Sequence, residues 1–234
     1  MKESNNEQLE QFRKNASEES LGLSSEDILK DIVSYVKSSK HLSSLQSVSI
    51  FDVGCGTGDL LCEFKKYLKD VSLTGCDYTD FKVLSDPSIE FFQHDCNKDL
   101  PTQTPQFDLV TSSEVIEHIE NPRHFVRQLS SKLKKDGILI ISTPNLESIT
   151  SLLSFALRGY HSAFGGKAYP AHITAVGAYD LTNMINEASG LRVLNTHFVQ
   201  NGRMPGMNVR WSSLFPFLKS KRFSDNYFIV AQKI

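Results

Sequence analysis

The stretch Ile50-Phe51-Asp52-Val53-Gly54-Cys55-Gly56-Thr57-Gly58 decides the fold. It follows a β-branched and aromatic run at 48–53, which predicts a buried strand, and it leads into a segment at 60–68 with helical spacing of apolar residues. Glycine at alternate positions lets the backbone turn tightly and approach a ligand. Open α/β sheets bind ligands outside the carboxyl ends of their strands, and this loop would lie there.

The spacing of the glycines narrows the class of ligand. The dinucleotide fingerprint is G-x-G-x-x-G, whereas this loop has G-x-G-x-G with Asp52 beside it. An acidic side chain there suits a ligand with an ammonium or sulfonium group better than a pyrophosphate. The loop therefore argues against a nicotinamide-dependent oxidoreductase, which remains the weaker alternative, and no Gly-Lys-Ser/Thr of a phosphate loop follows it.

The rest of the chain alternates between strand and helix patterns. Such alternation predicts an α/β fold with a mostly parallel sheet and helices on both faces. We expect one domain over 26–234, preceded by a flexible polar lead-in at 1–25. The last two strands have no clear helix between them, so they are expected to pair antiparallel at the sheet edge. Strands are predicted at 71–75, 89–93, 107–111, 137–142, 191–199 and 227–232, and helices at 26–37, 122–133, 146–157 and 179–188.

Composition excludes several other classes of protein. The chain has 234 residues, a net charge of −2 and 40% hydrophobic residues, which are values typical of a globular domain. The near-neutral charge gives no strong nucleic-acid signal. The longest apolar runs, 138–141 and 152–157, are far shorter than the roughly 20 residues of a membrane span. The N-terminus lacks the pattern of a secretory signal, and the four cysteines form no CxxC pair, so a cytoplasmic protein is predicted.

Three acidic residues follow three successive predicted strands. They are Asp52, Asp77 and Asp95. A carboxylate at the position of Asp77 can accept both hydroxyl groups of a ribose, and Asp95 could accept a hydrogen bond from an adenine amino group. Any one of these acids alone could simply cap a turn. Three acids in register favour a shared ligand.

At these residues the chain closely resembles the class I S-adenosylmethionine-dependent methyltransferases. The resemblance also rests on Phe107-Asp108-Leu109-Val110, on Glu114-Val115-Ile116-Glu117-His118-Ile119 and on 133–145, and it covers about 48–200 and 226–233. It is greatest to the branch that includes ubiquinone-biosynthesis O-methyltransferases. The resemblance implies a Rossmann-like, seven-stranded sheet with an antiparallel edge hairpin. Asp136 departs from the proline common in the family, at an expected surface turn.

The resemblance also implies a function and a cofactor site. The function is transfer of a methyl group from S-adenosylmethionine to a small-molecule acceptor, with a hydroxyl oxygen favoured. No Asn/Asp-Pro-Pro-Tyr/Phe motif of nitrogen-methylating enzymes follows the fourth strand. A catalytically weak module that binds the cofactor is the main alternative. The implied cofactor-binding residues are Asp52, Gly54, Cys55, Gly56, Gly58, Asp77, Tyr78, Asp95, Cys96 and Ser112.

The candidate catalytic residues follow the fourth strand. Glu114, Glu117 and His118 have the spacing that places side chains on one face of a helical turn. His118 could be a general base, the three residues could bind a divalent cation, or a Glu114–His118 contact could merely orient the loop. The contact is favoured over the base, and the base over the cation. His172 could complete a metal site if its loop folds over this turn. It could equally be a base, a substrate contact or a capping residue.

Two long loops are candidates for substrate contacts, because long ordered loops are usually functional. The segment 146–178 is expected to form a substrate-binding lid, and the alternative is that its helix simply covers the sheet. Its amphipathic part, 149–157, lacks the basic residues of a membrane-surface helix. The segment 200–225 contains Arg203, Arg210, Trp211 and Phe215, which could contact a planar substrate or form a dimer interface. Both a monomer and a homodimer remain open.

Overall fold

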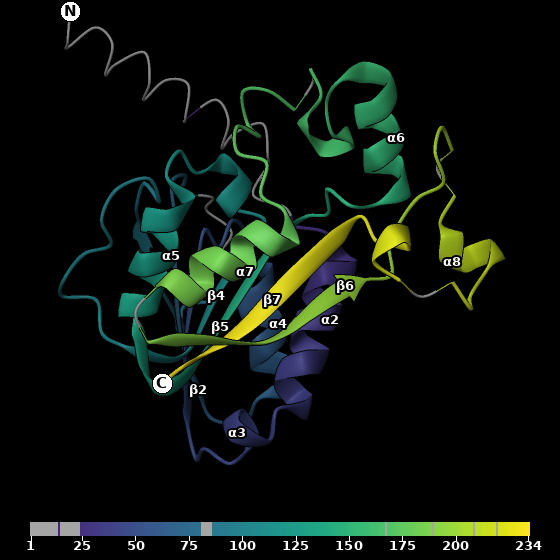
Figure 1. Ribbon diagram of the computed structural model, residues 1–234. Coiled ribbons are helices and arrows are strands. Elements are labelled where there is room, and N and C mark those ends of the chain that lie inside the picture. The colour runs from purple at the N-terminus through teal and green to yellow at the C-terminus, as the bar shows by residue number, and fades with distance from the viewer. Residues whose placement is uncertain are drawn as a thin grey trace, which may run out of the picture.

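A seven-stranded sheet forms the centre of the molecule (Figure 1). The computed structural model describes residue 14 and residues 24–80, 86–166, 168–188, 190–207, 209–218 and 220–234. The strand order is β3-β2-β1-β4-β5-β7-β6. The pairs from β3 to β5 are parallel, and β7 runs antiparallel to both β5 and β6. The strands are β1 (Val48–Val53), β2 (Val71–Asp77), β3 (Ile89–Gln93), β4 (Phe107–Ser113), β5 (Leu133–Pro144), β6 (Leu191–Val199) and β7 (Asn226–Lys233).

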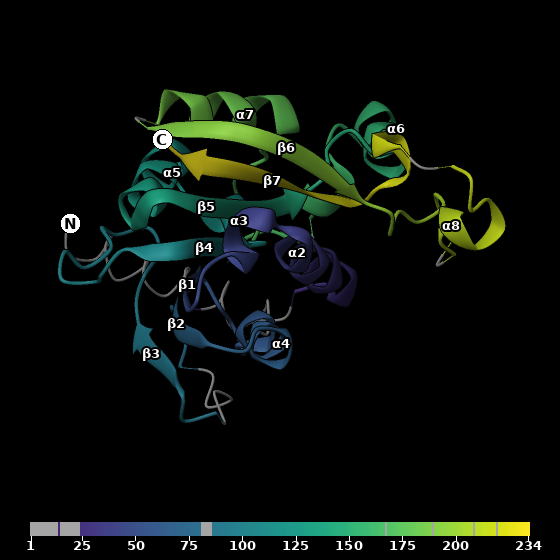
Figure 2. The same cartoon turned by 90° about the horizontal axis from the view of Figure 1, so that it is seen from below.

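Helices cover both faces of this sheet (Figure 2). One face carries α2 (Glu26–Ser38), α3 (Lys40–Ser43) and α4 (Asp59–Tyr67), and the other carries α5 (Pro122–Ser131) and α7 (Ala178–Glu187). Two buried clusters result, one on each side of the sheet. The remaining helical segments are η1 (Ile116–His118), α6 (Ile149–Arg158), η2 (Ser162–Phe164), α8 (Trp211–Leu214) and η3 (Lys221–Phe223).

Local sequence explains why these elements form. Strand β1 is buried along most of its length, and its Val48, Ile50, Phe51 and Val53 belong to the two cores. A parallel strand that is covered on both faces needs such a continuous apolar run. Helix α5 begins where Asn121 accepts a hydrogen bond from the His124 backbone N–H, with proline at its first position.

The predicted α/β architecture is confirmed. The seven strands, the parallel majority, the helices on both faces and the antiparallel edge hairpin all occur as expected. Strands β4 and β5 are longer than predicted. The pairing of β4 continues to Ser113, and that of β5 begins at Leu133. Most of the expected lead-in, 1–13 and 15–23, lies outside the described residues. Within the described residues, no helix is long and apolar enough to cross a membrane.

Candidate functional site

The glycine loop lies between β1 and α4 and depends on glycine at three positions. Gly54, Gly56 and Gly58 have φ angles of 77°, 52° and 81°, in the left-handed region that favours glycine. The backbone N–H groups of Gly54 and Cys55 donate to the carbonyl oxygen of Cys76, at 2.8 and 3.0 Å. The loop is therefore held against the end of β2, with its backbone facing the carboxyl edge of the sheet.

A pocket opens at this edge, between the glycine loop and the start of α2. The buried Asp52 forms part of its wall, and the Thr111 hydroxyl donates to Asp52 Oδ1 at 2.7 Å. Burial and, to a smaller extent, the nearby charge of Asp77 raise the pKa of Asp52 to about 7, against the effect of the Thr111 hydrogen bond. The pocket is lined by Ser24, Leu29, Asp52, Gly54, Cys55, Thr57, Asp59, Leu60 and Ser113.

Asp77 also contacts the glycine loop. Its Oδ2 accepts a hydrogen bond from the Gly56 backbone N–H at 2.8 Å, and its Oδ1 accepts one from Thr79 N–H at 3.2 Å. Burial raises the pKa of Asp77, against these hydrogen bonds. The neighbouring Tyr78 carbonyl oxygen accepts a hydrogen bond from Gln93 Nε2. Each carboxylate oxygen of Asp77 has a second lone pair, so hydroxyl groups of a ligand could still bind there.

The other predicted cofactor residues lie after β3 and at the end of β4. Asp95 Oδ1 accepts a hydrogen bond from Asn97 N–H at 3.0 Å, so this carboxylate also stabilises a turn. The Cys96 thiol contacts that of Cys76, and both cysteines are free. Ser112 Oγ is buried without a hydrogen-bond partner among the described residues. A buried hydroxyl of this kind suits a site that a ligand completes.

Glu114 does not share a face with Glu117 and His118, which corrects the sequence-based expectation. Glu114 follows β4 directly and has a φ angle of 56°, so no helical turn includes it. Its carboxylate accepts hydrogen bonds from Ser25 N–H at 3.0 Å and from Asn226 Nδ2 at 2.7 Å. Glu114 therefore connects the start of α2 and the start of β7 to the end of β4. Burial raises its pKa.

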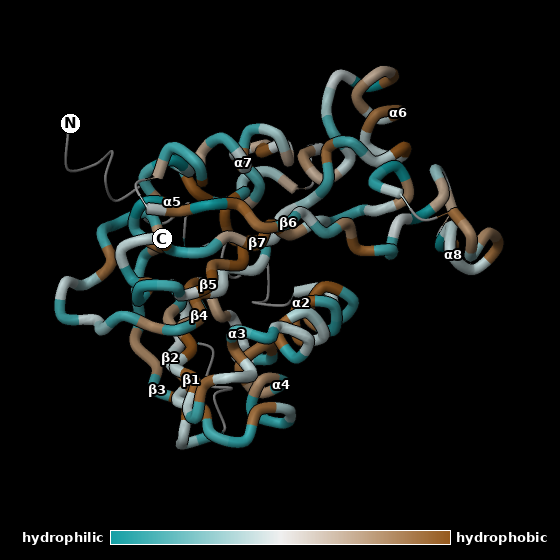
Figure 3. Tube along the Cα trace, turned by 60° about the horizontal axis from the view of Figure 1, so that its bottom comes forward, coloured by the Kyte–Doolittle hydropathy of each residue, from teal (hydrophilic) through white to brown (hydrophobic). Residues whose placement is uncertain are grey.

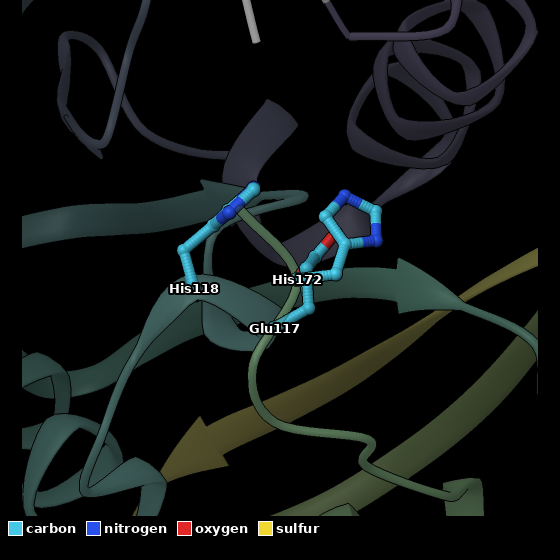
Figure 4. A group of neighbouring side chains, drawn as sticks. All are labelled: Glu117, His118 and His172. Carbon is cyan, nitrogen blue, oxygen red and sulfur yellow. The ribbon is translucent and has the colours of Figure 1, made fainter. Parts of the chain in front are cut away.

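Glu117, His118 and His172 instead form a cluster (Figure 4). One donor atom from each side chain lies within 4.8 Å of the other two. Glu117 and His118 come from η1, and His172 comes from the long segment that crosses over this turn. The backbone N–H groups of Ile173 and Thr174 donate to the Glu117 carbonyl oxygen at 2.9 Å, which fixes the crossing.

The two imidazoles are held in one tautomer. His118 Nδ1 lies 2.8 Å from the Ala171 carbonyl oxygen, and His172 Nδ1 lies 2.7 Å from that of Ala163. A carbonyl oxygen only accepts, so each Nδ1 carries the proton and each Nε2 keeps its lone pair. Burial lowers the pKa of His118 to about 4 and also lowers that of His172. Both rings are therefore neutral near pH 7 and can accept a proton or bind a cation.

Glu117 is the third member of the cluster and is fully buried. Burial, and then the charge of Glu114, raise its pKa to about 8, while the Thr143 hydroxyl donates to its Oε2 at 3.0 Å. Two neutral imidazoles and a carboxyl group are a donor set that suits a transition-metal cation. The chemistry of these residues thus allows either a base or a cation site.

Sequence reasoning missed several residues of the site. Ser24 lines the pocket from the end of the expected lead-in, and its hydroxyl donates to Ser113 O at 3.4 Å. Thr143 orients Glu117 from β5. A strand threonine and a serine before a helix carry no local signal of these roles. In the 200–225 loop, Arg210 is paired with Asp27 at 2.7 Å, and Trp211 packs against the Phe223 ring.

Comparison with known proteins gives one matching family. Residues 8–196 match a family described as "Methyltransferase domain". The ubiquinone biosynthesis O-methyltransferase of Saccharomyces cerevisiae is 28% identical over 208 residues, which is 83% of this chain and 62% of that protein. The corresponding protein of Dictyostelium discoideum is 30% identical over 58% of this chain and 44% of its own length. The chain thus spans about half the length of these two relatives.

Solved structures show the same fold in proteins of different activity. Magnesium protoporphyrin IX methyltransferase from Synechocystis, with bound SAH, superposes with a TM-score of 0.60 at 16% identity, covering 88% of this chain and 82% of that one. A [4+2]-cyclase, SpnF, gives the same TM-score and identity over 88% of this chain and 80% of its own. The fold alone therefore does not determine the reaction.

Proposed function

The chain belongs to the methyltransferase domain family, and from that premise we propose that it transfers the methyl group of S-adenosylmethionine to a hydroxyl oxygen of a small molecule. The observation that supports oxygen as the acceptor is the His118 imidazole, which is neutral and presents Nε2 with its lone pair. A hydroxyl group needs a base or a metal to become a good nucleophile.

The cofactor, when bound, supplies an activated methyl group and its own leaving group. In the proposed arrangement, Asp52 faces the positively charged methionine end from the pocket wall. Asp77 and Asp95 accept hydrogen bonds from the ribose and the adenine amino group, with Tyr78 and the Cys96 backbone beside them. The unpartnered hydroxyl of Ser112 finds its partner on the same ligand.

His118 acts as the general base in this proposal. Its Nε2 accepts the proton of the acceptor hydroxyl as the oxygen attacks, and the Ala171 carbonyl oxygen holds the ring orientation through Nδ1. The centroid of the His172 ring lies 4.9 Å from that of the His118 ring. Burial of the cluster keeps water away from the proton transfer.

A divalent cation is the alternative use of the same cluster. Glu117, His118 and His172 would bind it, and the cation would polarise the hydroxyl group in place of the base. The pKa of Glu117, raised to about 8, favours the base, because a metal ligand must lose its proton. Activity that survives strong chelation and Glu117→Ala would exclude the cation. If chelation abolished activity and added metal restored it, a mechanism in which His118 acts as a base without a cation would be excluded.

The class of acceptor is supported by the relatives. Those quoted are named for O-methylation in ubiquinone biosynthesis, and another relative, from Halalkalibacterium halodurans, is a malonyl-[acyl-carrier protein] O-methyltransferase. We therefore propose a small molecule with an ionisable hydroxyl group as the acceptor. We also propose a cytoplasmic location for this chain, in contrast to the yeast and Dictyostelium relatives, which are named mitochondrial.

The test separates cofactor binding from catalysis. We expect S-adenosylhomocysteine, but not NADH, to raise the melting temperature, and labelled cofactor to methylate a phenol from a panel of acceptors. His118→Ala should lower kcat by roughly 10²–10⁴-fold with little change in S-adenosylhomocysteine affinity. His124→Ala is the matched control, because His124 is a partly buried histidine that contacts Asp99 outside the cluster. Binding without any methyl transfer would instead indicate a cofactor-binding module.

A further inference from the structure

The start of helix α2 forms one wall of the candidate cofactor pocket. Ser24 and Leu29 line the pocket from this side, and Asp52, Gly54 and Ser113 are among the residues that line the rest. The pocket formed by the described residues has a volume of about 240 Å³, open solvent included, which is below the roughly 300–1,000 Å³ of sites for drug-sized ligands. A molecule of the size of S-adenosylmethionine therefore fits only when a segment of the wall moves.

The body of α2 is anchored in the core, whereas its first residues are not. The buried apolar residues of this helix begin at Ile28 and continue to Val36, and Figure 3 shows both brown and teal residues along α2. Before Ile28, Glu26 is exposed and Asp27 is half-buried. Polar contacts therefore hold the segment 24–27, which we call the strap.

Glu114 makes the first of these polar contacts. Its Oε2 accepts a hydrogen bond from the Ser25 backbone N–H at 3.0 Å, and its Oε1 accepts one from Asn226 Nδ2 at 2.7 Å. The carboxylate thus lies at the N-terminal end of α2, where the helix dipole favours a negative charge. The left-handed φ angle of 56° at Glu114 costs free energy in a residue with a Cβ, and such a backbone persists where contacts require it. Glu114 therefore holds the strap against the end of β4.

Arg210 holds the strap from the outside. Its Nη1 and Nη2 lie 3.2 and 2.7 Å from Oδ1 and Oδ2 of Asp27, which is the geometry of a bidentate pair. The two side chains are 49% and 28% exposed, so water can solvate both charges when the pair opens. Arg210 follows a hairpin in which the Met204 backbone N–H donates to the Val209 carbonyl oxygen at 2.8 Å. The pair therefore joins the strap to the 203–218 segment, far away in the sequence.

We propose that the strap is the gate through which the cofactor enters and leaves, and that the 203–218 segment controls this gate through the Arg210–Asp27 pair. This inference rests on the proposed function, since S-adenosylmethionine and its product are the ligands that pass the gate. Opening breaks the exposed ion pair and the hydrogen bond from Ser25 to Glu114, while α2 from Ile28 onward stays in the core. Movement of the 203–218 segment would then change the rate at which S-adenosylhomocysteine leaves.

The exchange kinetics of labelled S-adenosylhomocysteine test the ion pair. Arg210→Gln removes an exposed pair, so the melting temperature should not change. The association and dissociation rate constants should rise together, each by about two- to fivefold, with the dissociation constant unchanged within about twofold. Lys221→Gln is the matched control, because Lys221 forms an ion pair of similar exposure with Glu147 instead of with the strap. That variant should exchange the ligand at the rates of the unchanged chain.

Salt provides a second readout, because it screens exposed ion pairs. Raising the ionic strength from about 0.05 to about 0.5 M should speed exchange of the ligand in the unchanged chain and in Lys221→Gln, but not in Arg210→Gln. Asp27→Asn combined with Arg210→Gln should be no faster than Arg210→Gln alone, since both changes break the same contact.

Glu114→Gln tests the second contact of the strap. Glutamine keeps an oxygen for Asn226, but its amide nitrogen cannot accept the hydrogen bond from Ser25. The dissociation rate constant of S-adenosylhomocysteine should rise by about tenfold. In the ligand-free chain, hydrogen exchange of the strap amides should be faster in Glu114→Gln and in Arg210→Gln, but not in Lys221→Gln.

The outcomes separate the gate from the proposed function. If S-adenosylhomocysteine binds and Arg210→Gln has the rate constants of Lys221→Gln, the gate is overturned and the cofactor site stands. A rise in the dissociation rate constant alone would also overturn the gate, because Arg210 would then stabilise only the bound state. If calorimetry detected no binding of S-adenosylhomocysteine to the unchanged chain, the proposed cofactor site would fall, and the gate with it.

Discussion

At the scale of single residues, burial determines the protonation of the site. Asp52 and Glu117 have pKa values raised to about 7 and about 8, and His118 has one lowered to about 4. All three groups therefore shift toward their neutral forms near pH 7. A ligand that brings positive charge beside such a carboxyl group must favour its ionised form.

Asp52 should make binding of S-adenosylmethionine depend on pH. The cofactor is cationic at its methionine end, so binding lowers the pKa of Asp52 and releases its proton. Affinity should therefore rise by up to about tenfold per unit as the pH increases toward 7, and level off above it. Calorimetric titrations between pH 5.5 and 8.5 measure this slope. Asp52→Asn should flatten it and the distant Asp99→Asn should not, whereas a slope that persists in Asp52→Asn would remove Asp52 from the site.

Glu117 should make the stability of the ligand-free chain fall with rising pH. Its folded pKa of about 8 lies above the ordinary value of 4.5, so the folded state binds the extra proton. The resulting stability is present below about pH 4.5 and is lost as the pH rises through 8. Denaturant unfolding gives the free energy of unfolding at pH 5 and at pH 9. The loss between the two pH values should be smaller by about 2–4 kcal/mol in Glu117→Gln than in the unchanged chain.

The matched control for that experiment is Glu90→Gln, at an exposed position of β3. Glutamine keeps an acceptor for the Thr143 hydroxyl, so Glu117→Gln should remain folded. Asp52 also makes the free energy of unfolding fall with rising pH, because its pKa is raised as well. The pH dependence should therefore shrink in Glu117→Gln without vanishing. An unchanged difference would mean that Glu117 is ionised in the folded chain.

At the scale of elements, periodicity predicted the strands and helices but not the geometry after β4. A strand or helix that is set by local contacts can be predicted from the pattern of its apolar residues. The predicted strand at 48–53 and helix at 26–37 therefore match β1 and α2 almost residue for residue. The spacing of Glu114, Glu117 and His118 implies a shared face only within a helix. Here Glu114 takes a left-handed conformation directly after the strand. His172 joins the cluster because its segment crosses over η1, far away in the sequence. The spacing of residues along the chain does not determine such a long-range contact.

The glycine loop is the element on which the cofactor pocket depends. Gly54 has a φ angle of 77°, and a Cβ there would collide with the Val115 side chain. Gly54→Ala should therefore cost about 1–3 kcal/mol in unfolding free energy and weaken cofactor binding at least about tenfold. Gly159→Ala is the matched control, since Gly159 has a φ angle of 81° but open space around it. That variant should lose only about 1 kcal/mol and bind the cofactor normally.

At the scale of the whole molecule, the candidate cofactor pocket and the exposed helix α6 occupy different parts of the chain. The pocket lies between the ends of β1 and β4 and the start of α2. Helix α6 and the 203–218 segment extend beyond the end of the sheet (Figures 1 and 2). Sequence alone predicted a lid over the substrate for 146–178. The apolar residues of α6 are exposed, so a lid made by this segment would have to close when the cofactor binds.

Hydrogen exchange tests whether the segment 146–178 closes as a lid. S-adenosylhomocysteine at 100 times its dissociation constant should stabilise the fold by about 2.7 kcal/mol. It should slow exchange of the amides at 24–29, 54–60 and 76–79, which border the pocket or hold its loop. Exchange in α6 and at 209–218 should not change, because these exposed segments open locally and do not contact the cofactor. Equal protection of α6 would show that it closes over the pocket as the lid expected from the sequence.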